Sequence, residues 1–89
     1  MKERKRIVDL AEFSEVAIES LLAALSDGDE KHPPGSWMSE NTGNQYNHLM
    51  AHLRALQNGI EKDDQGHDHL NHVICRAVII AALRRRDRT

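Results

Sequence analysis

The sequence predicts an all-α domain of three helices, with a long first helix packed on a helical hairpin formed by the other two. In three separate segments apolar residues recur three and four positions apart, the spacing that places them on one face of a helix. No segment alternates apolar and polar residues as a half-buried strand does. At 89 residues, the chain is long enough for one small domain, expected over 1–89, and too short for two.

The first helix is expected over about residues 5–26. Asp27 and Gly28 are interpreted as its stop signal, because glycine readily adopts the left-handed conformation that ends helices. Pro33 lacks a backbone donor and disfavours continuation, so residues 27–43 are expected to form a long loop. The apolar stripe consists of Ile7, Leu10, Ala11, Ala17, Ile18, Leu21, Leu22 and Leu25.

The second and third helices are expected over about residues 44–58 and 68–85. Gly59 follows the second helix at the position of a left-handed cap, and a polar turn separates the two. The second helix carries a narrow stripe of Tyr46, Leu49, Met50, Leu53 and Leu56. The last two-thirds of the third helix is apolar nearly all round, so it has to be covered on more than one side.

A thin core predicts self-association. Hydrophobic residues make up 39% of the chain, yet the only aromatics are Phe13, Trp37 and Tyr46. Small domains bury the smallest fraction of their surface, and the first two helices can cover only part of the apolar third helix. We therefore expect a homo-oligomer.

Charge and cysteine content limit the kinds of partner and compartment. Twelve Lys and Arg against fourteen Asp and Glu give a net charge of −2, whereas a general nucleic-acid or acidic-membrane binder shows a marked basic excess. The single cysteine, Cys75, cannot form an intramolecular disulfide, and the chain shows neither a leader pattern nor a long apolar run. A soluble cytoplasmic protein is expected.

Six histidines form the strongest chemical signal. His48 and His52 are four positions apart and share a helical face, as do His69 and His72, three apart. An antiparallel hairpin brings His52 close to His69 or His72, and Asp63 or Asp64 in the turn could complete a divalent metal site. The alternative is that these histidines only form hydrogen bonds to the neighbouring helix.

Other residues offer weaker chemistry. Glu12, Glu15 and Glu19 have a spacing that can hold Mg²⁺, although carboxylates on a solvated helix face are far commoner. Arg54 and Arg76 could bind phosphate or form salt bridges between helices. Trp37 and Tyr46 could stack on a base, with anchoring of the loop to the core as the alternative for Trp37.

The middle and end of the chain resemble a known family. The pattern runs from Trp37 through Tyr46, an HL-x-A segment, a glycine, acidic residues, a second glycine and an HL-x-H segment at 69–72. In this order it resembles the phage-borne family dATP/dGTP diphosphohydrolase, N-terminal, over about residues 10–83. The most specific part consists of His52, Gly59, Asp63, Asp64, Gly66, His69 and His72.

The resemblance implies a nucleotide-handling domain, encoded by a phage or prophage, in the host cytoplasm. It would hydrolyse a purine deoxynucleoside triphosphate between the α and β phosphates. Divalent ions, Mg²⁺ or Mn²⁺ first and Zn²⁺ after them, would polarise the phosphate and activate water. The metal ligands would be drawn from His48, His52, Asp64, His69 and His72, and the catalytic residues would be His52, Asp64 and His72. The nucleotide-binding residues would be Lys31, Trp37, Tyr46, Arg54 and Arg76.

The sequence departs from the carboxylate pattern of related enzymes, and this difference leaves other functions open. All-α pyrophosphohydrolases of the MazG-like kind, which this family resembles, carry an ExxE motif on one helix and an ExxD motif on a later one. Glu12 and Glu15 can stand for the first pair, but the third helix has His69 and His72 in place of the second. The alternatives are a protein that sequesters a nucleotide signal without chemistry and a helical interaction scaffold. An enzyme needs metal-dependent turnover, a sequestering protein returns its ligand intact, and a scaffold does neither.

Overall fold

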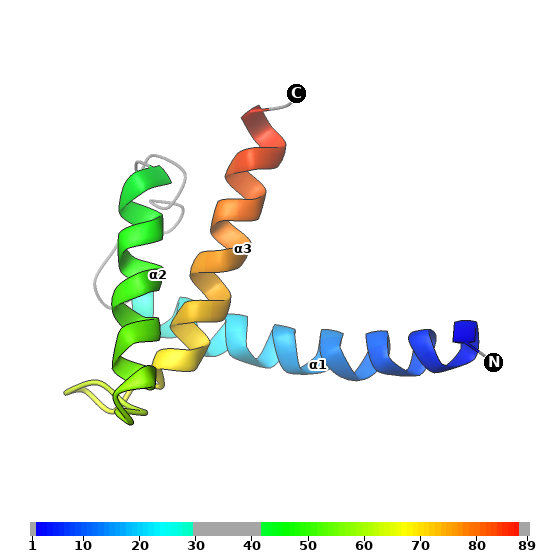
Figure 1. Ribbon diagram of the computed structural model, residues 1–89, viewed down its shortest axis with the longest axis horizontal. Coiled ribbons are helices and arrows are strands. Elements are labelled where there is room, and N and C mark those ends of the chain that lie inside the picture. Colours follow the sequence, from blue (N-terminus) through cyan, green and yellow to red (C-terminus); the bar gives the residue numbers. More distant parts are fainter. Residues whose placement is uncertain (1, 30–41, 88–89) are drawn as a thin grey trace.

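The computed structural model contains the three predicted helices: α1 Lys2–Asp29, α2 Thr42–Gln57 and α3 His69–Asp87 (Figure 1). It describes residues 2–29 and 42–87, with the side chains of α1 described from 8 to 27. Within these ranges the only β pairing is one isolated bridge between Lys62 and Asp68. The all-α prediction is confirmed, and each helix boundary lies within three residues of its expected place.

One predicted boundary is wrong for an instructive reason. Asp27 and Gly28 were expected to stop the first helix, but α1 continues through both to Asp29. A glycine inside a helix costs only about 1 kcal/mol relative to alanine, so contacts with other elements can override it. Asp27 has such contacts, because its carboxylate lies beside His67 and His72.

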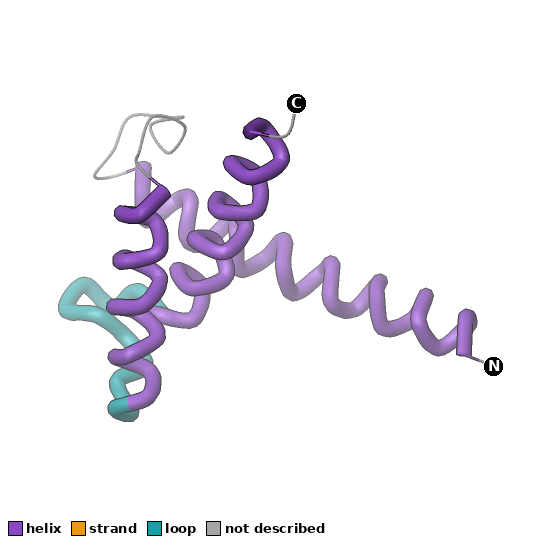
Figure 2. The backbone as a smooth tube through the Cα atoms, turned by 45° about the horizontal axis from the view of Figure 1, so that its top comes forward, coloured by secondary structure: helices purple, strands orange, loops and turns teal. Residues whose placement is uncertain are grey.

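The three helices are arranged as a hairpin crossed by a long arm. α2 and α3 run antiparallel, and α3 packs against both other helices (Figures 1 and 2). The C-terminal part of α1 passes behind the hairpin, where Asp27 lies beside His67 of the connecting loop, while its N-terminal part projects to one side (Figures 1 and 2). The radius of gyration is 14.7 Å, against about 12 Å for a compact chain of this length. The shape is therefore extended.

Small residues let α1 approach α3. Ser20 and Ala24 are buried on α1, with Ala17 and Leu21 half-buried beside them at helical spacing. In the described part of the chain, the buried apolar side chains are Ala24, Cys75 and Ile80. This confirms the prediction of a thin core.

Polar bonds join the two helices of the hairpin. Arg76 Nη1 donates to Gln45 Oε1 over 2.6 Å, and Gln45 is fully buried at 0% exposure. Nearer the open end of the hairpin, Arg84 Nη2 donates to the Tyr46 hydroxyl over 2.7 Å. Among the helices described, none is long and apolar enough to cross a membrane.

Candidate functional site

The end of α2 is fixed by backbone hydrogen bonds around Gly59. The N–H of Ile60 donates to the Ala55 carbonyl over 2.9 Å, and that of Gly59 donates to the Leu56 carbonyl over 3.0 Å. This pair of bonds is the Schellman motif, and it requires the left-handed φ of +80° that Gly59 adopts. The predicted cap at Gly59 is confirmed, and it determines where His52 lies relative to the following loop.

Asp63 organises the turn that carries His67. Its Oδ1 accepts hydrogen bonds from the backbone N–H groups of Gln65 and His67, each over 2.9 Å. The N–H of Gly66 donates to the Asp63 carbonyl over 3.0 Å, with Gly66 at a φ of +84°. Because one carboxylate holds both sides of the turn, the backbone of His67 has a defined position.

α3 begins with a capped first turn. Asp68 Oδ1 accepts the N–H of Leu70 over 2.9 Å, as an N-cap side chain does. The N–H of His69 donates to the Glu61 carbonyl over 2.9 Å, which ties the start of the helix back to the loop. His69 therefore opens α3 and His72 follows three residues later on the same side of the helix.

The predicted convergence of His52 with His69 and His72 is present. The Nδ1 atoms of His52 and His69 are 2.8 Å apart, so one of them donates and the other accepts. The His52 ring also stacks on that of His72, with centroids 4.9 Å apart and planes at 15°. Three imidazoles from α2 and α3 thus form one continuous cluster.

The surroundings of His52 keep it neutral. Burial is the main reason why the pKa of His52 falls from 6.5 to about 4. Repulsion from nearby positive charge lowers this pKa further, in the order His72, His69, Arg76 and His48. At pH 7 its ring is therefore uncharged, with one nitrogen able to donate and one able to accept.

A second group of side chains adjoins this cluster and comes from three elements. Asp27 at the end of α1 lies with Oδ1 3.4 Å from His67 Nε2 and Oδ2 3.3 Å from His72 Nε2. On the other side of the His67 ring, Asp63 Oδ2 is 3.7 Å from Nδ1. Asp27, His67 and His72 each offer one ligand atom within 4.8 Å of the other two. Among the described residues these three could hold a metal ion.

Several predicted site residues lie away from this group. Asp64 is exposed, and its neighbour Asp63 faces the histidines instead. His48 is exposed one turn before His52, and Arg54 is exposed on the other side of α2, about 200° around the helix from His52. Lys31 and Trp37 lie outside the described residues.

Tyr46 and Arg76 hold the hairpin together. The Tyr46 hydroxyl accepts from Arg84, and the side chain is 40% exposed. Arg76 donates to Gln45, yet it stands four residues after His72 on the same face of α3 and lowers the pKa of His52. It is the predicted arginine whose charge reaches the cluster.

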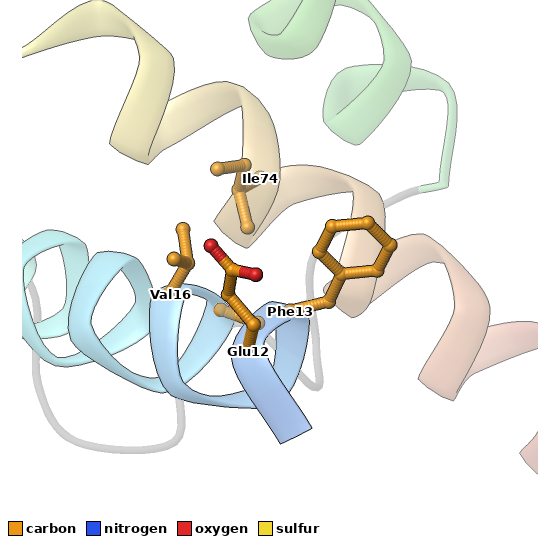
Figure 3. A pocket seen from close by; sticks show the side chains of 5 residues that line it. Glu12, Phe13, Val16 and Ile74 are labelled. Atoms are coloured by element: carbon orange, nitrogen blue, oxygen red, sulfur yellow. The ribbon is translucent and has the colours of Figure 1, made fainter. Parts of the chain in front are cut away.

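The glutamates of α1 are remote from the histidines. Glu12 lines a shallow hollow between α1 and α3 whose other walls are apolar, among them Phe13, Val16 and Ile74 (Figure 3). Asp27 is fifteen residues further along α1 from Glu12, about 22 Å at 1.5 Å per residue. Glu12 therefore cannot share a metal ion with the Asp27 group.

Asp27 and His67 were not predicted as site residues, and Asp63 was named as the alternative to Asp64. His67 carried a signal, because it opens the His-x-His-x-x-His run formed with His69 and His72. Asp27 carried none, since forty positions separate it from His67 and only the crossing of α1 behind the hairpin brings them together.

The fold and site define a class: a small all-α domain with a polar centre of histidines and aspartates where the first helix meets a helical hairpin. The chain belongs to the family dATP/dGTP diphosphohydrolase, N-terminal, which matches residues 2–89, and the resemblance seen in the sequence is thereby confirmed. No curated protein and no solved structure matches the chain.

Proposed function

We propose that this domain takes part in hydrolysing purine deoxynucleoside triphosphates between the α and β phosphates, releasing pyrophosphate. The family description names a dATP/dGTP diphosphohydrolase, which makes a purine deoxynucleotide the first substrate to test. The observation that carries the proposal is the polar centre itself: Asp27, His67 and His72 converge beside a neutral His52. Groups able to bind a cation and to move a proton thus lie together.

The residues of this centre suit phosphate chemistry in different ways. A divalent cation held by Asp27, His67 and His72 would polarise a phosphate oxygen and lower the pKa of a bound water. His52 is neutral at pH 7, so one ring nitrogen can accept a proton from an attacking water, and its pKa of about 4 makes it a weak general base. Arg76, on the same face of α3 as His72, adds positive charge for the phosphates.

The test offers the purified chain a mixed pool of ribo- and deoxynucleoside triphosphates with Mg²⁺, Mn²⁺ or Zn²⁺, and identifies products by mass spectrometry. We expect a purine deoxynucleoside monophosphate and pyrophosphate, both abolished by EDTA. His72→Gln should lose turnover, whereas His48→Gln, exposed one turn from His52, should keep it. Full turnover in a folded His72→Gln protein would overturn the site assignment.

A second candidate is a domain that binds the nucleotide and leaves it intact. It is favoured by α3, which has His69 and His72 at the positions where a MazG-like enzyme would carry its second carboxylate pair. The same experiment separates the two. Nucleotide released unaltered from denatured protein, with no monophosphate in any metal, would replace the hydrolase with a binding protein.

A further inference from the structure

We infer that Asp27, His67 and His72 form a binding site for one divalent transition-metal ion of the zinc or manganese class. The site differs from the set expected from sequence, because it takes Asp27 from α1 and His67 from the loop and leaves Asp64 out. Its part in catalysis rests on the proposed function, but binding of the ion does not.

The spacing of the three side chains fits such an ion. Ligand atoms about 2.1 Å from a tetrahedral ion lie about 3.4 Å from one another. The two distances from Asp27 oxygens to imidazole nitrogens are 3.4 and 3.3 Å, and all three ligand atoms lie within 4.8 Å. The two short distances involve different oxygens of Asp27, Oδ1 toward His67 and Oδ2 toward His72, so the other distances between ligand atoms have to shorten when the ion binds.

Burial without hydrogen bonding points the same way. His72 Nε2 is buried, and no hydrogen bond reaches it among the residues that the structure describes. Most buried polar atoms do have a partner, so a ring nitrogen left without one beside a carboxylate needs an explanation. A cation between Asp27 and His72 supplies it.

The neighbours of the two histidines orient them for binding. Asp63 Oδ2 lies 3.7 Å from His67 Nδ1, on the opposite side of the ring from Asp27. At this distance the two atoms form no hydrogen bond, and His67 Nδ1 is buried without a hydrogen-bond partner among the described residues. The nearby negative charge favours a hydrogen on Nδ1, which leaves Nε2 to bind metal, the tautomer common in zinc-bound histidines. His72 is held by stacking on His52.

The donor set selects the class of ion. Two imidazole nitrogens and one carboxylate suit Zn²⁺, Mn²⁺ or Fe²⁺, whereas Mg²⁺ prefers oxygen ligands throughout. Three protein ligands leave at least one coordination position for water or a phosphate oxygen, as in catalytic sites. The ion expected here is therefore not Mg²⁺, the first choice from sequence.

The experiment is a calorimetric titration of the EDTA-treated, dialysed full chain with ZnCl₂ alone, repeated with CoCl₂ and read by visible absorption. One ion per chain is expected. Asp27→Asn and His72→Gln should each weaken binding at least about tenfold. The matched controls are Asp64→Asn and His48→Gln, both at exposed positions, which should bind as the unsubstituted chain does. Circular dichroism establishes that each variant is folded.

Two results would overturn the site: no saturable binding by the unsubstituted chain, or equal binding by a folded Asp27→Asn protein. If Asp27→Asn does not fold, Zn²⁺ binding is measured in Asp27→Glu and His67→Gln instead. Weaker binding by these folded variants is expected, and unchanged binding by both would overturn the site. The titration contains no nucleotide, so its outcome is separate from that of the hydrolysis assay. Binding without turnover would keep the site and remove the hydrolase proposal.

Independently, we propose that α1 pairs antiparallel with α1 of a second copy of this chain. Ile18, Leu22 and Leu25 are 57%, 63% and 48% exposed. Leu22 stands two positions from both Ser20 and Ala24, about 200° around the helix from the face that packs on α3. α1 thus presents a second apolar stripe that the hairpin does not cover.

Area and the symmetry of the stripe identify a second copy of this chain as its occupant. The chain exposes 7085 Å², against about 5300 Å² for a compact monomer of 10.1 kDa. The excess is more than the roughly 800 Å² that each partner buries in a standard interface. Antiparallel pairing centred between positions 21 and 22 brings Ile18 of each copy opposite Leu25 of the other, so the stripe is complementary to itself, as a two-fold interface requires.

Sedimentation of the full chain tests this pairing. A species of twice the 10.1 kDa chain mass is expected, with a Tm that rises with concentration. Leu22→Lys should give the monomer or, if pairing is needed for folding, an unfolded chain. Val78→Lys, at a 45% exposed apolar position on α3, should leave the dimer unchanged. A monomer with a concentration-independent Tm would overturn the proposal, as would a dimeric Leu22→Lys protein.

Discussion

The Nδ1 atoms of His52 and His69 lie 2.8 Å apart across the α2–α3 hairpin, although seventeen positions separate the two residues in sequence. At that distance one ring must donate and the other accept, so the pair shares a single proton. If both rings were protonated, two positive charges would be in contact and both Nδ1 atoms would carry hydrogens that face each other. The close approach therefore helps to explain why the pKa of His52 is low.

This relationship predicts how stability changes with pH in the EDTA-treated protein. The pKa of His52 is about 4 when folded, and the ordinary value of 6.5 applies when unfolded. Below pH 6.5 the unfolded chain takes up a proton that the folded chain refuses until about pH 4, so the free energy of unfolding should fall as pH drops across that window. Above pH 6.5 His52 should contribute no slope.

Urea unfolding at several pH values between 4.5 and 7.5 measures the effect, with His52→Gln as the matched variant. Glutamine cannot take up the proton, so the loss of stability toward acid should be smaller in the variant. Parallel pH profiles for the two proteins would contradict the assignment of this slope to His52.

The bond between Arg76 and Gln45 predicts a clear asymmetry between two arginines of α3. Arg76→Leu removes a donor from a fully buried amide oxygen and should destabilise the fold by about 1–3 kcal/mol. Arg84→Leu removes the bond to the exposed Tyr46 hydroxyl and should cost under about 0.5 kcal/mol. Urea unfolding of both variants checks this, and equal losses would show that the buried bond adds nothing.

The helices could be predicted because their signals are local. Apolar spacing and the cap at Gly59 lie within a few residues of the elements they specify, and the Gly59 cap is present as expected. Hairpin formation then follows from the polar turn at residues 58–68 between the two helices, so the meeting of His52 with His69 and His72 was also predictable.

The acidic part of the site was not predictable, since it depends on how helices cross. Asp63 and Asp64 are adjacent acids in one turn, and only the backbone bonds to Asp63 decide which of them faces His67. Asp27 depends on α1 continuing past its expected stop and passing behind the hairpin. Spacing along the chain holds no information about either.

Burial makes Cys75 a probe of global unfolding. The thiol is 7% exposed, and burial raises its pKa above the ordinary value of 9.0. Because the thiolate is the reactive form, modification by a disulfide reagent at pH 8 should be slow in the folded protein and fast in denaturant. The rate should rise in step with the urea unfolding transition. Rapid reaction under native conditions would mean that α3 separates from its neighbours without global unfolding.

Asp63 and Asp64 form the sharpest matched pair in the chain. Asp63→Ala removes the acceptor of the Gln65 and His67 backbone N–H groups, and we expect a loss of about 1–3 kcal/mol in urea unfolding of the EDTA-treated protein. Asp64→Ala, at the exposed neighbouring position, should change stability by less than about 0.5 kcal/mol.

A second substitution at Asp63 separates the effect of this residue on stability from its effect on metal binding. Asp63→Asn keeps an oxygen that can accept the two N–H bonds but removes the charge beside His67 Nδ1. It should retain most of the stability while weakening Zn²⁺ binding about 10- to 100-fold, the usual effect of removing a carboxylate that orients a metal-bound histidine. Unchanged affinity in a folded Asp63→Asn protein would show that the Asp63 carboxylate does not orient His67 for the ion.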